Sequence, residues 1–174
     1  GVFSLGILGN QLTSELVLTD IQFLLCLHLA LLLQHQFEEY QFPGGFKDYF
    51  NTNIYKKSII IRFPLNDTAI FIVNVIIAWT AYIYSALHPN NLWLALGLFC
   101  ITFFNGFLHS FLFFRKKKYN PGFYTGLFFF IPFYSYALYT LSEALSKEDW
   151  ILGLLIFVIC TAAIPGSIYL SNKL

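Results

Sequence analysis

Five stretches of this 174-residue chain are almost wholly apolar, and no other feature limits its fold as much. They cover residues 21–39, 69–87, 92–114, 122–142 and 150–171. About 20 apolar residues form a helix long enough to cross the hydrocarbon core of a bilayer. Each stretch is apolar on all sides, as expected when lipid and neighbouring helices surround a helix. We therefore predict an all-α membrane bundle with five transmembrane helices.

Composition supports the membrane assignment. Hydrophobic residues make up 57% of the chain and charged residues 11%, against roughly 25% charged residues in soluble domains. Transmembrane β-strands alternate apolar and polar residues, whereas runs such as FFFIPF do not. No second domain, internal repeat or low-complexity linker is evident, so residues 1–174 are predicted to form a single membrane domain. Within residues 1–18 the apolar run GVFSLGILG is too short to span, and we expect an interfacial segment or the remnant of a truncated N-terminus there.

The basic residues predict an orientation, because Lys and Arg in short loops favour the cytoplasmic side. Nine of the ten fall on one side of an alternating five-span arrangement. They are Lys47, Lys56, Lys57, Arg62, Arg115, Lys116, Lys117, Lys118 and Lys173. We therefore expect the N-terminus outside and the C-terminus in the cytoplasm. The run at 115–118 is interpreted as a topology anchor beside the lipid bilayer, and no nucleic-acid partner is predicted.

The predicted cytoplasmic loop at 40–68 contains a second helical pattern. Phe46, Tyr49, Phe50 and Ile54 recur at helical spacing and alternate with basic residues. Such a pattern is typical of a short amphipathic helix lying on a membrane surface. We predict an interfacial helix in this loop.

Polar side chains in three spans are predicted to lie at one depth. His35 precedes Tyr40, at the expected interface, by five residues, and His109 precedes Arg115 by six. At 1.5 Å per residue these separations correspond to roughly 8 and 9 Å. Asn74 lies roughly 10 Å from the same side by the same measure. These spans therefore bring polar groups together near the cytoplasmic face.

The stretch HQFEEY at 35–40 places ionisable groups on one helix face. His35, Glu38 and Glu39 are three and four residues apart, so their side chains meet on a helix. His28 lies two turns earlier, close to the same line, and Asn105 in another span is four residues from His109. Because ionisable groups at membrane depth are costly and usually face the bundle interior, these residues are candidates for a functional site.

Two imidazoles and a carboxylate can bind zinc or iron, here through His35, Glu39 and His109. Glu38 would then act as general base toward a water molecule that the metal activates, although the two glutamates are interchangeable at this stage. Asn105 would orient the histidines. A hydrogen-bonded His–Glu network without metal and a metal-free acid–base site stay open.

Two further polar residues have two interpretations each, and the cysteines have none. His28 is either a third ligand or one half of a single interhelical hydrogen bond. Asn74 either bridges two helices or lines the site. Cys26, Cys100 and Cys160 lie inside apolar spans without metal-type spacing, and we assign them no role.

Three motifs carry a family resemblance. HQFEEYQFPGGF at 35–46, NGFLH at 105–109 and YNPG at 119–122 resemble, in order and spacing, the HXXEE family of small bacterial membrane proteins. The resemblance covers residues 30 to 145 and implies a multi-pass protein of the bacterial plasma membrane. The signature positions that it implies are His35, Glu38, Glu39, Asn105, His109, Tyr119, Pro121 and Gly122. It implies that a site exists and leaves its chemistry open. On physical grounds, Pro121 also suits the first turn of the span at 122–142, after a loop that turns at the cytoplasmic surface.

Three functional hypotheses follow from these residues. The first is a membrane enzyme, a metal-dependent hydrolase or an acid–base isomerase, acting on a lipid or another apolar substrate from the inner leaflet. The second is a small ion- or proton-coupled carrier, and the third is a non-catalytic partner subunit. A polar path that reaches both faces would favour the carrier. No serine nucleophile elbow, phosphate loop or dinucleotide fingerprint is present in the sequence.

Overall fold

The structure, a computed structural model, describes residues 20–58 and 63–173. All regular secondary structure in these two ranges is helical, which confirms the all-α part of the predicted fold class. The expected N-terminal segment at 1–18 and the basic residue Arg62 lie outside the described residues.

Each of the five predicted apolar stretches forms a helix. The helices are α2 (Asp20–Tyr40), a continuous helix of α4 (Asp67–Phe71), η2 (Ile72–Trp79) and α5 (Thr80–Leu87), α6 (Leu92–Lys116), a continuous helix of α7 (Phe123–Thr125), η3 (Gly126–Phe130) and α8 (Ile131–Ser142), and α9 (Lys147–Ser171). Polar side chains cap the N-terminal ends of two of these helices. The side chain of Asn66 accepts from the Ala69 N–H before α4, and Ser146 and Asp149 form a reciprocal capping box before α9.

Three of these helices are long and apolar enough to cross a membrane. They are the continuous helix Asp67–Leu87, α6 and α9. By the same measure of length and composition, α2 and the helix from α7 to α8 are not among them. The physical reason lies in their sequences, because α2 ends in QHQFEEY and α8 contains several Tyr, Ser and Thr residues. The five helices are therefore confirmed, while crossing is supported for three.

Two helices contain π-helical segments that the sequence did not predict, η2 and η3. Such segments appear where the regular hydrogen-bond ladder is disturbed, and they frequently mark functional sites. The η3 segment ends at Phe130, two residues before Pro132. Proline lacks the N–H that would continue the ladder and clashes with the preceding turn. Pro132 therefore gives a physical reason for the wider turn at η3.

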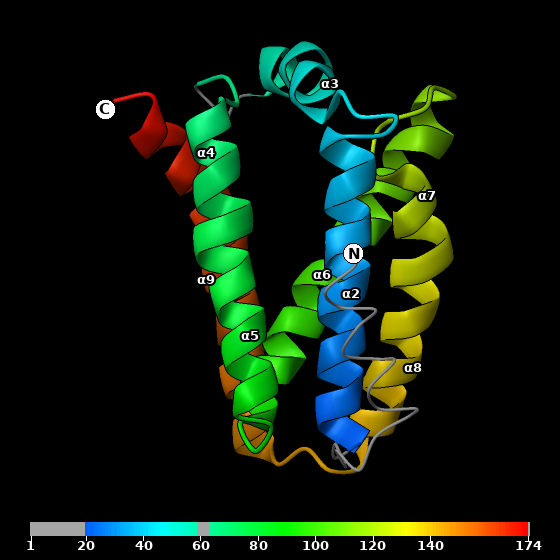
Figure 1. Cartoon of the computed structure of the whole chain (residues 1–174), viewed down its shortest axis with the longest axis vertical. Coiled ribbons are helices and arrows are strands. Elements are labelled where there is room, and N and C mark those ends of the chain that lie inside the picture. Colours follow the sequence, from blue (N-terminus) through cyan, green and yellow to red (C-terminus); the bar gives the residue numbers. More distant parts are fainter. Residues whose placement is uncertain (1–19, 59–62, 174) are drawn as a thin grey trace.

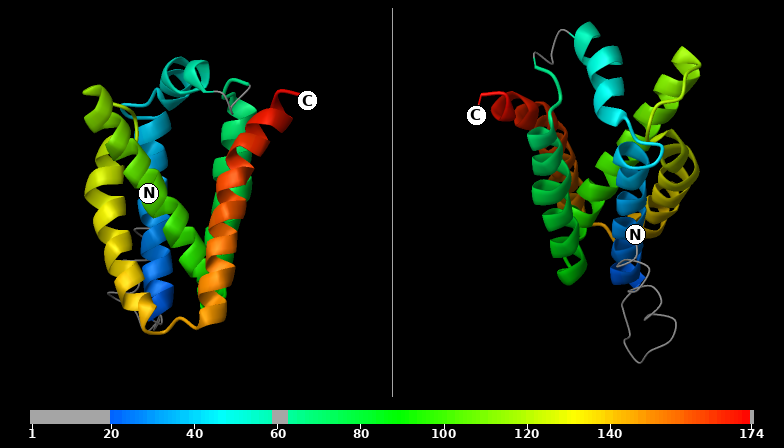
Figure 2. Two further views of the ribbon diagram at one scale, coloured as in Figure 1. Left: turned by 180° about the vertical axis from the view of Figure 1, so that it is seen from behind. Right: turned by 45° about the horizontal axis from the view of Figure 1, so that its top comes forward.

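The helices form two groups that α6 joins. Figure 1 shows the α4–α5 helix beside α9, and α2 beside α7 and α8, with α6 running diagonally between the two groups. Seen from behind, α6 passes from the α7 end of one group to the opposite end of α9 (Figure 2). Its upper half, which carries Asn105 and His109, therefore lies with α2 and η3.

A close helix contact positions this upper half of α6. A Cβ on Gly106 would meet the Gly126 carbonyl oxygen at 2.9 Å and the Phe130 Cβ at 2.8 Å. Glycine at such a crossing lets two helix backbones approach closely. Because His109 lies one turn beyond Gly106 on α6, the contact brings its imidazole against the start of the α7–α8 helix.

A short helix covers the end of the bundle at which this contact lies. It is α3 (Phe46–Asn53), followed by the 3₁₀ turn η1 (Tyr55–Lys57), and Figure 1 shows it above α2 and α4. The α3 residues Tyr49 and Phe50 are buried, and Lys116 at the end of α6 donates to the Asn53 carbonyl. The predicted short helix is confirmed, and its location on a membrane surface stays a prediction.

Candidate metal centre

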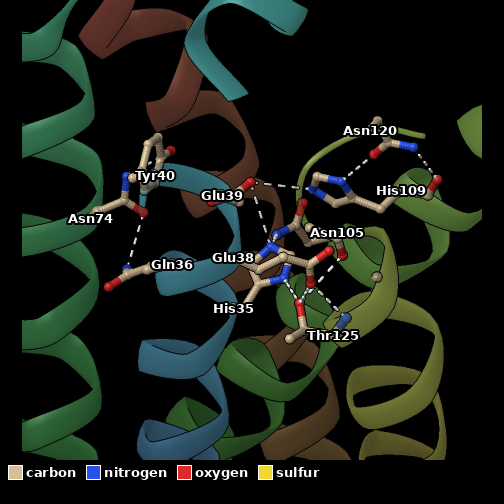
Figure 3. A network of polar contacts seen from close by, with 12 residues as sticks. His35, Gln36, Glu38, Glu39, Tyr40, Asn74, Asn105, His109, Asn120 and Thr125 are labelled. Atoms are coloured by element: carbon tan, nitrogen blue, oxygen red, sulfur yellow. Dashed lines mark hydrogen bonds and ion pairs between the residues drawn. The ribbon is translucent and has the colours of Figure 1, made fainter. Parts of the chain in front are cut away.

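Three buried side chains from two helices converge near the end of the bundle. His35 and Glu39 lie on α2, and His109 lies on α6 (Figure 3). The Glu39 Oε1 atom is 3.5 Å from His35 Nε2 and 3.3 Å from His109 Nε2. The exposed fraction is only 1% for His35, 5% for Glu39 and 3% for His109. We call this group the His35 centre, and it could hold a metal ion.

Asn120 fixes the protonation pattern of the His109 ring. The Asn120 Nδ2 group donates to the His109 backbone carbonyl at 3.0 Å, and its Oδ1 lies 2.6 Å from His109 Nδ1. Since a carbonyl only accepts, the amide orientation is determined, and Oδ1 must accept from an Nδ1–H. In the neutral ring the lone pair is then on Nε2, which faces Glu39.

Thr125 fixes the His35 ring in the same way. The Thr125 hydroxyl donates to Glu38 Oε2 at 2.6 Å, and the same oxygen lies 2.6 Å from His35 Nδ1. A hydroxyl has one proton to donate, so this oxygen must accept from the Nδ1–H of His35. The His35 Nε2 atom therefore also presents a lone pair toward Glu39.

Glu38 is held by four hydrogen bonds from one segment of the chain. Its Oε1 accepts from the Tyr119 hydroxyl at 2.9 Å and the Tyr124 N–H at 3.0 Å. Its Oε2 accepts from the Thr125 N–H at 2.7 Å in addition to the Thr125 hydroxyl. Burial and the neighbouring Glu38 carboxylate raise the pKa of Tyr119 well above its ordinary value, so this phenol keeps the proton that it donates. The four donors leave Glu38 as an ionised anchor for the Tyr119–Thr125 segment.

The distances within the His35 centre match those of a metal site. A tetrahedral site with bonds of about 2.0–2.1 Å separates neighbouring ligand atoms by about 3.3 Å. The measured N–O separations are 3.3 and 3.5 Å. Three electron-rich atoms this close repel one another unless a cation or a proton lies between them. The centre is therefore arranged for a positive charge.

Apolar groups enclose the centre. The Phe130 ring lies 4.5 Å from the His35 ring, and the Phe46 ring of α3 lies 5.6 Å from the His109 ring, measured between centroids. Gly122 closes a third side, because a Cβ there would lie 2.7 Å from His35 Cε1 and 2.6 Å from His109 Cε1. Low-dielectric surroundings of this kind strengthen the attraction of the centre for a cation.

The YNPG motif builds the turn that carries Gly122. The Phe123 N–H donates to the Asn120 carbonyl, and Gly122 has φ 96° and ψ −6°. Proline at the second position and a left-handed glycine at the third are the signature of a type II turn. Pro121 was predicted in the first turn of a helix, and the structure corrects this, because the helix begins at Phe123 and Pro121 precedes it.

Of the two predicted asparagines, only Asn105 lies beside the centre. The Asn105 Nδ2 atom lies 3.1 Å from His35 Nε2, and this side chain is only half-buried. Asn74 points elsewhere, since it accepts from Gln36 and donates to the Tyr40 hydroxyl. Of the two predicted roles for Asn74, the contacts fit a bridge between helices α2 and η2.

His28 is remote from the His35 centre. It is fully buried two turns earlier on α2, and its Nε2 lies 3.0 Å from the Thr102 hydroxyl of α6. This contact fits the predicted interhelical hydrogen bond, and His28 is not among the residues that could hold the metal ion.

Sequence reasoning missed Asn120 and Thr125, which orient the two imidazoles. Asn120 is the variable position of the YxPG motif, directly before its proline. Thr125 lies in an apolar stretch, three residues after Gly122. A polar residue at each of these positions, close to a turn predicted at the cytoplasmic surface, was the available signal.

The comparisons with known proteins identify the family. A family model described as a protein of unknown function with HXXEE motif matches residues 26–137, more than half of the chain. No curated protein and no solved structure matches the chain. The matched region includes every residue of the His35 centre together with Glu38, Asn105, Asn120 and Thr125. This chain belongs to the HXXEE family.

Proposed function

We propose that this protein is a multi-pass membrane enzyme of the bacterial plasma membrane whose His35 centre binds a divalent metal. Its substrate would be a lipid or another apolar molecule that enters from the inner leaflet. The observation that supports this most is the pair of Nε2 lone pairs directed at one carboxylate oxygen, at 3.5 and 3.3 Å. Each lone pair results from an outer partner that holds the proton on Nδ1.

The proposed topology has five spans with the His35 centre near the cytoplasm. In Figure 1, α3, the end of α6 and the C-terminal end of α9 all lie at one end of the bundle. The described basic residues of the loop at 40–68, the run at 115–118 and Lys173 are therefore together at this end, and the positive-inside tendency places it in the cytoplasm. α2 and the α7–α8 helix would be the two spans with polar residues, tolerated because those residues face the bundle interior.

Zinc or iron fits the donor set. Two imidazole nitrogens and one carboxylate oxygen are ligands that both metals accept. With three protein ligands a fourth position stays free for substrate or water, as in catalytic zinc sites. The metal would supply Lewis-acid chemistry, which suits hydrolysis and proton-transfer isomerisation equally.

The surrounding residues have distinct proposed roles. His35, Glu39 and His109 hold the metal. Asn105 donates to His35 Nε2 at 3.1 Å. With a metal on that lone pair, its half-buried amide would be free to bind a substrate oxygen. Glu38, predicted as general base, has four donors on its two oxygens. We propose that it positions Thr125, and through it His35, rather than acting as a general base.

The depth of the centre favours an apolar substrate. His35 lies about one and a half turns before the end of α2, and His109 about two turns before the end of α6, which corresponds to roughly 8–10 Å below the interface in a membrane. Phe46 and Phe130 border it. A water-soluble substrate would need to be desolvated to reach this depth, whereas the apolar part of a lipid lies there already.

Metal content of the purified chain in detergent tests the proposal. The variants are His35→Ala, His109→Ala and Glu39→Gln, and the control is His88→Ala, because His88 is exposed at the opposite end of the bundle. We expect near-stoichiometric zinc or iron in the wild type and the control. The three variants should lose it while circular dichroism shows the same helical content.

Absence of metal after loading with zinc and with iron would contradict the metal site. The His35 centre would then be a proton-holding or structural network, and the carrier and partner-subunit hypotheses would rank above the enzyme. If metal binds, incubation with bacterial lipid vesicles followed by mass spectrometry identifies the substrate class, with Glu39→Gln as the inactive comparison.

A further inference from the structure

A second buried polar group lies deeper in the bundle, at His28. It combines His28 of α2, Tyr82 of α5, Thr102 of α6 and Tyr134 of α8, all buried. The His28 ring lies 4.2 Å from the Tyr82 ring and 4.6 Å from the Tyr134 ring, measured between centroids, both in edge-on contact. We call these four residues the His28 centre. Four helices thus meet at polar atoms inside the bundle.

Thr102 determines which nitrogen of His28 carries the proton. The Thr102 hydroxyl donates to the Leu98 carbonyl at 2.8 Å. Its oxygen must therefore accept from its other two partners, the Tyr82 hydroxyl and His28 Nε2 at 3.0 Å. His28 is then protonated on Nε2, and its lone pair is on Nδ1.

The lone pair on His28 Nδ1 and the Tyr134 hydroxyl have no hydrogen-bond partner among the described residues. Both are in side chains with no exposed surface. Both lone pairs of Thr102 are already occupied, so Thr102 cannot accept from Tyr134. On α5, one turn beyond Tyr82, the buried Ser85 hydroxyl also lacks a partner, although Thr102, Ser110 and Ser135 all donate to the carbonyl four residues back. Buried polar atoms in native proteins rarely stay unpaired.

We propose that the His28 centre is a second binding site, which holds water between His28 Nδ1 and Tyr134. The Nδ1 atom needs a donor and the Tyr134 hydroxyl needs an acceptor, and one water molecule supplies both. An ion does not fit, because the centre contains no charged side chain to balance it and the surrounding rings of Phe99 and Phe133 are apolar. Buried water typically makes about three hydrogen bonds, and His28 Nδ1 and the Tyr134 hydroxyl would supply two of them.

The variant Tyr134→Phe tests the site through the sign of its effect on the melting midpoint in detergent. Removal of a hydroxyl that truly lacks a partner relieves a desolvation penalty, and the midpoint would stay or rise. Removal of a hydroxyl bonded to water breaks a network, and the midpoint falls. We expect the fall. The control is Tyr136→Phe on the same helix, whose side chain is exposed and whose midpoint should not change.

Histidine-selective ¹⁵N NMR of the same proteins provides the second measurement. The His28 signals are assigned by their loss in His28→Phe. We expect an Nε2–H ring whose Nδ1 has the chemical shift of a hydrogen-bonded acceptor, and in Tyr134→Phe this shift moves toward that of a free acceptor. A midpoint that stays or rises, or an Nδ1 shift that does not respond, overturns the proposal.

Discussion

His28 and His35 lie on the same face of α2, two turns apart, and have opposite protonation patterns. Both are buried, and both contact α6, at Thr102 and Asn105 respectively. At His28 the proton is on Nε2 and the lone pair on Nδ1 lies among aromatic rings. At His35 the proton is on Nδ1 and the lone pair on Nε2 faces Glu39.

The partners of each ring explain this difference. Thr102 gives its proton to a backbone carbonyl and so must accept from Nε2 of His28. Thr125 gives its proton to Glu38 and so must accept from Nδ1 of His35. Two threonines on different sides of two imidazoles therefore direct one lone pair toward a carboxylate and the other away from any charge. A histidine in a membrane helix becomes a metal ligand through such partners, not through its depth alone.

The largest expected effect is the loss of zinc affinity when the negative charge of Glu39, which only the His35 centre contains, is removed. Glu39→Gln keeps the shape of the side chain and removes the negative charge that both Nε2 atoms face. We expect zinc affinity, measured by titration against a competing chelator, to fall by more than the roughly 10–100-fold that the loss of an outer partner costs. His28→Phe should leave the affinity unchanged. An equal loss in His28→Phe would mean that the two centres are not separate.

A clash at Gly122 should disrupt only the His35 centre. Gly122→Ala places a Cβ at 2.6 and 2.7 Å from the two imidazole Cε1 atoms, in addition to the left-handed strain of about 1–2 kcal/mol. Gly45→Ala is the matched control, because Gly45 has φ 89° and no atom within 4 Å of its Cβ position. We expect both variants to lower the melting midpoint and only Gly122→Ala to lose zinc. Retention of zinc by Gly122→Ala would show that the rings can move apart.

Asn120 tests the outer partner of His109. Asn120→Ala leaves the Nδ1–H and the backbone carbonyl of His109 without their partner in a fully buried position. We expect zinc affinity to fall roughly 10–100-fold, since the His109 ring loses the hydrogen bond that fixes its orientation. Asn74→Ala is the control, because Asn74 contacts Gln36 and Tyr40 rather than the His35 centre. A similar loss in Asn74→Ala would connect that bridge to the metal.

The sequence predicted the helices well because their signal is local. Apolar runs of span length, interrupted by polar loops, defined α2, α6 and α9 to within a few residues. The π-helical segments η2 and η3 were not predicted, since they depend on how neighbouring turns pack, and Pro132 alone does not specify a π-helical turn at η3. The apolar runs alone also did not separate α2, whose C-terminal end is polar, from the three helices that are long and apolar enough to cross a membrane.

The site was predicted in part for a related reason. His35 and Glu39 are one turn apart, and the depth argument added His109 from another helix, so these three were predicted together. The environment of Glu38 was not predictable, because its four donors come from Tyr119, Tyr124 and Thr125, more than 80 positions further along the chain. Asn74 was predicted at the right depth, but depth does not specify the direction of a side chain around the bundle.

The smallest expected effect on zinc affinity is that of Thr102→Val, in a comparison of the two threonines that direct the lone pairs. Thr125→Val removes the acceptor of His35 Nδ1 and a donor to Glu38, so we expect zinc affinity to fall roughly 10–100-fold. Thr102→Val removes the acceptor of His28 and Tyr82, which should cost about 1–3 kcal/mol of stability as the lost partner of buried donors. Zinc affinity of Thr102→Val should equal that of the wild type within the error of the titration. If Thr102→Val weakens zinc binding as much as Thr125→Val, the two centres form one coupled network along α2, and the separate assignment of metal to one and water to the other is wrong.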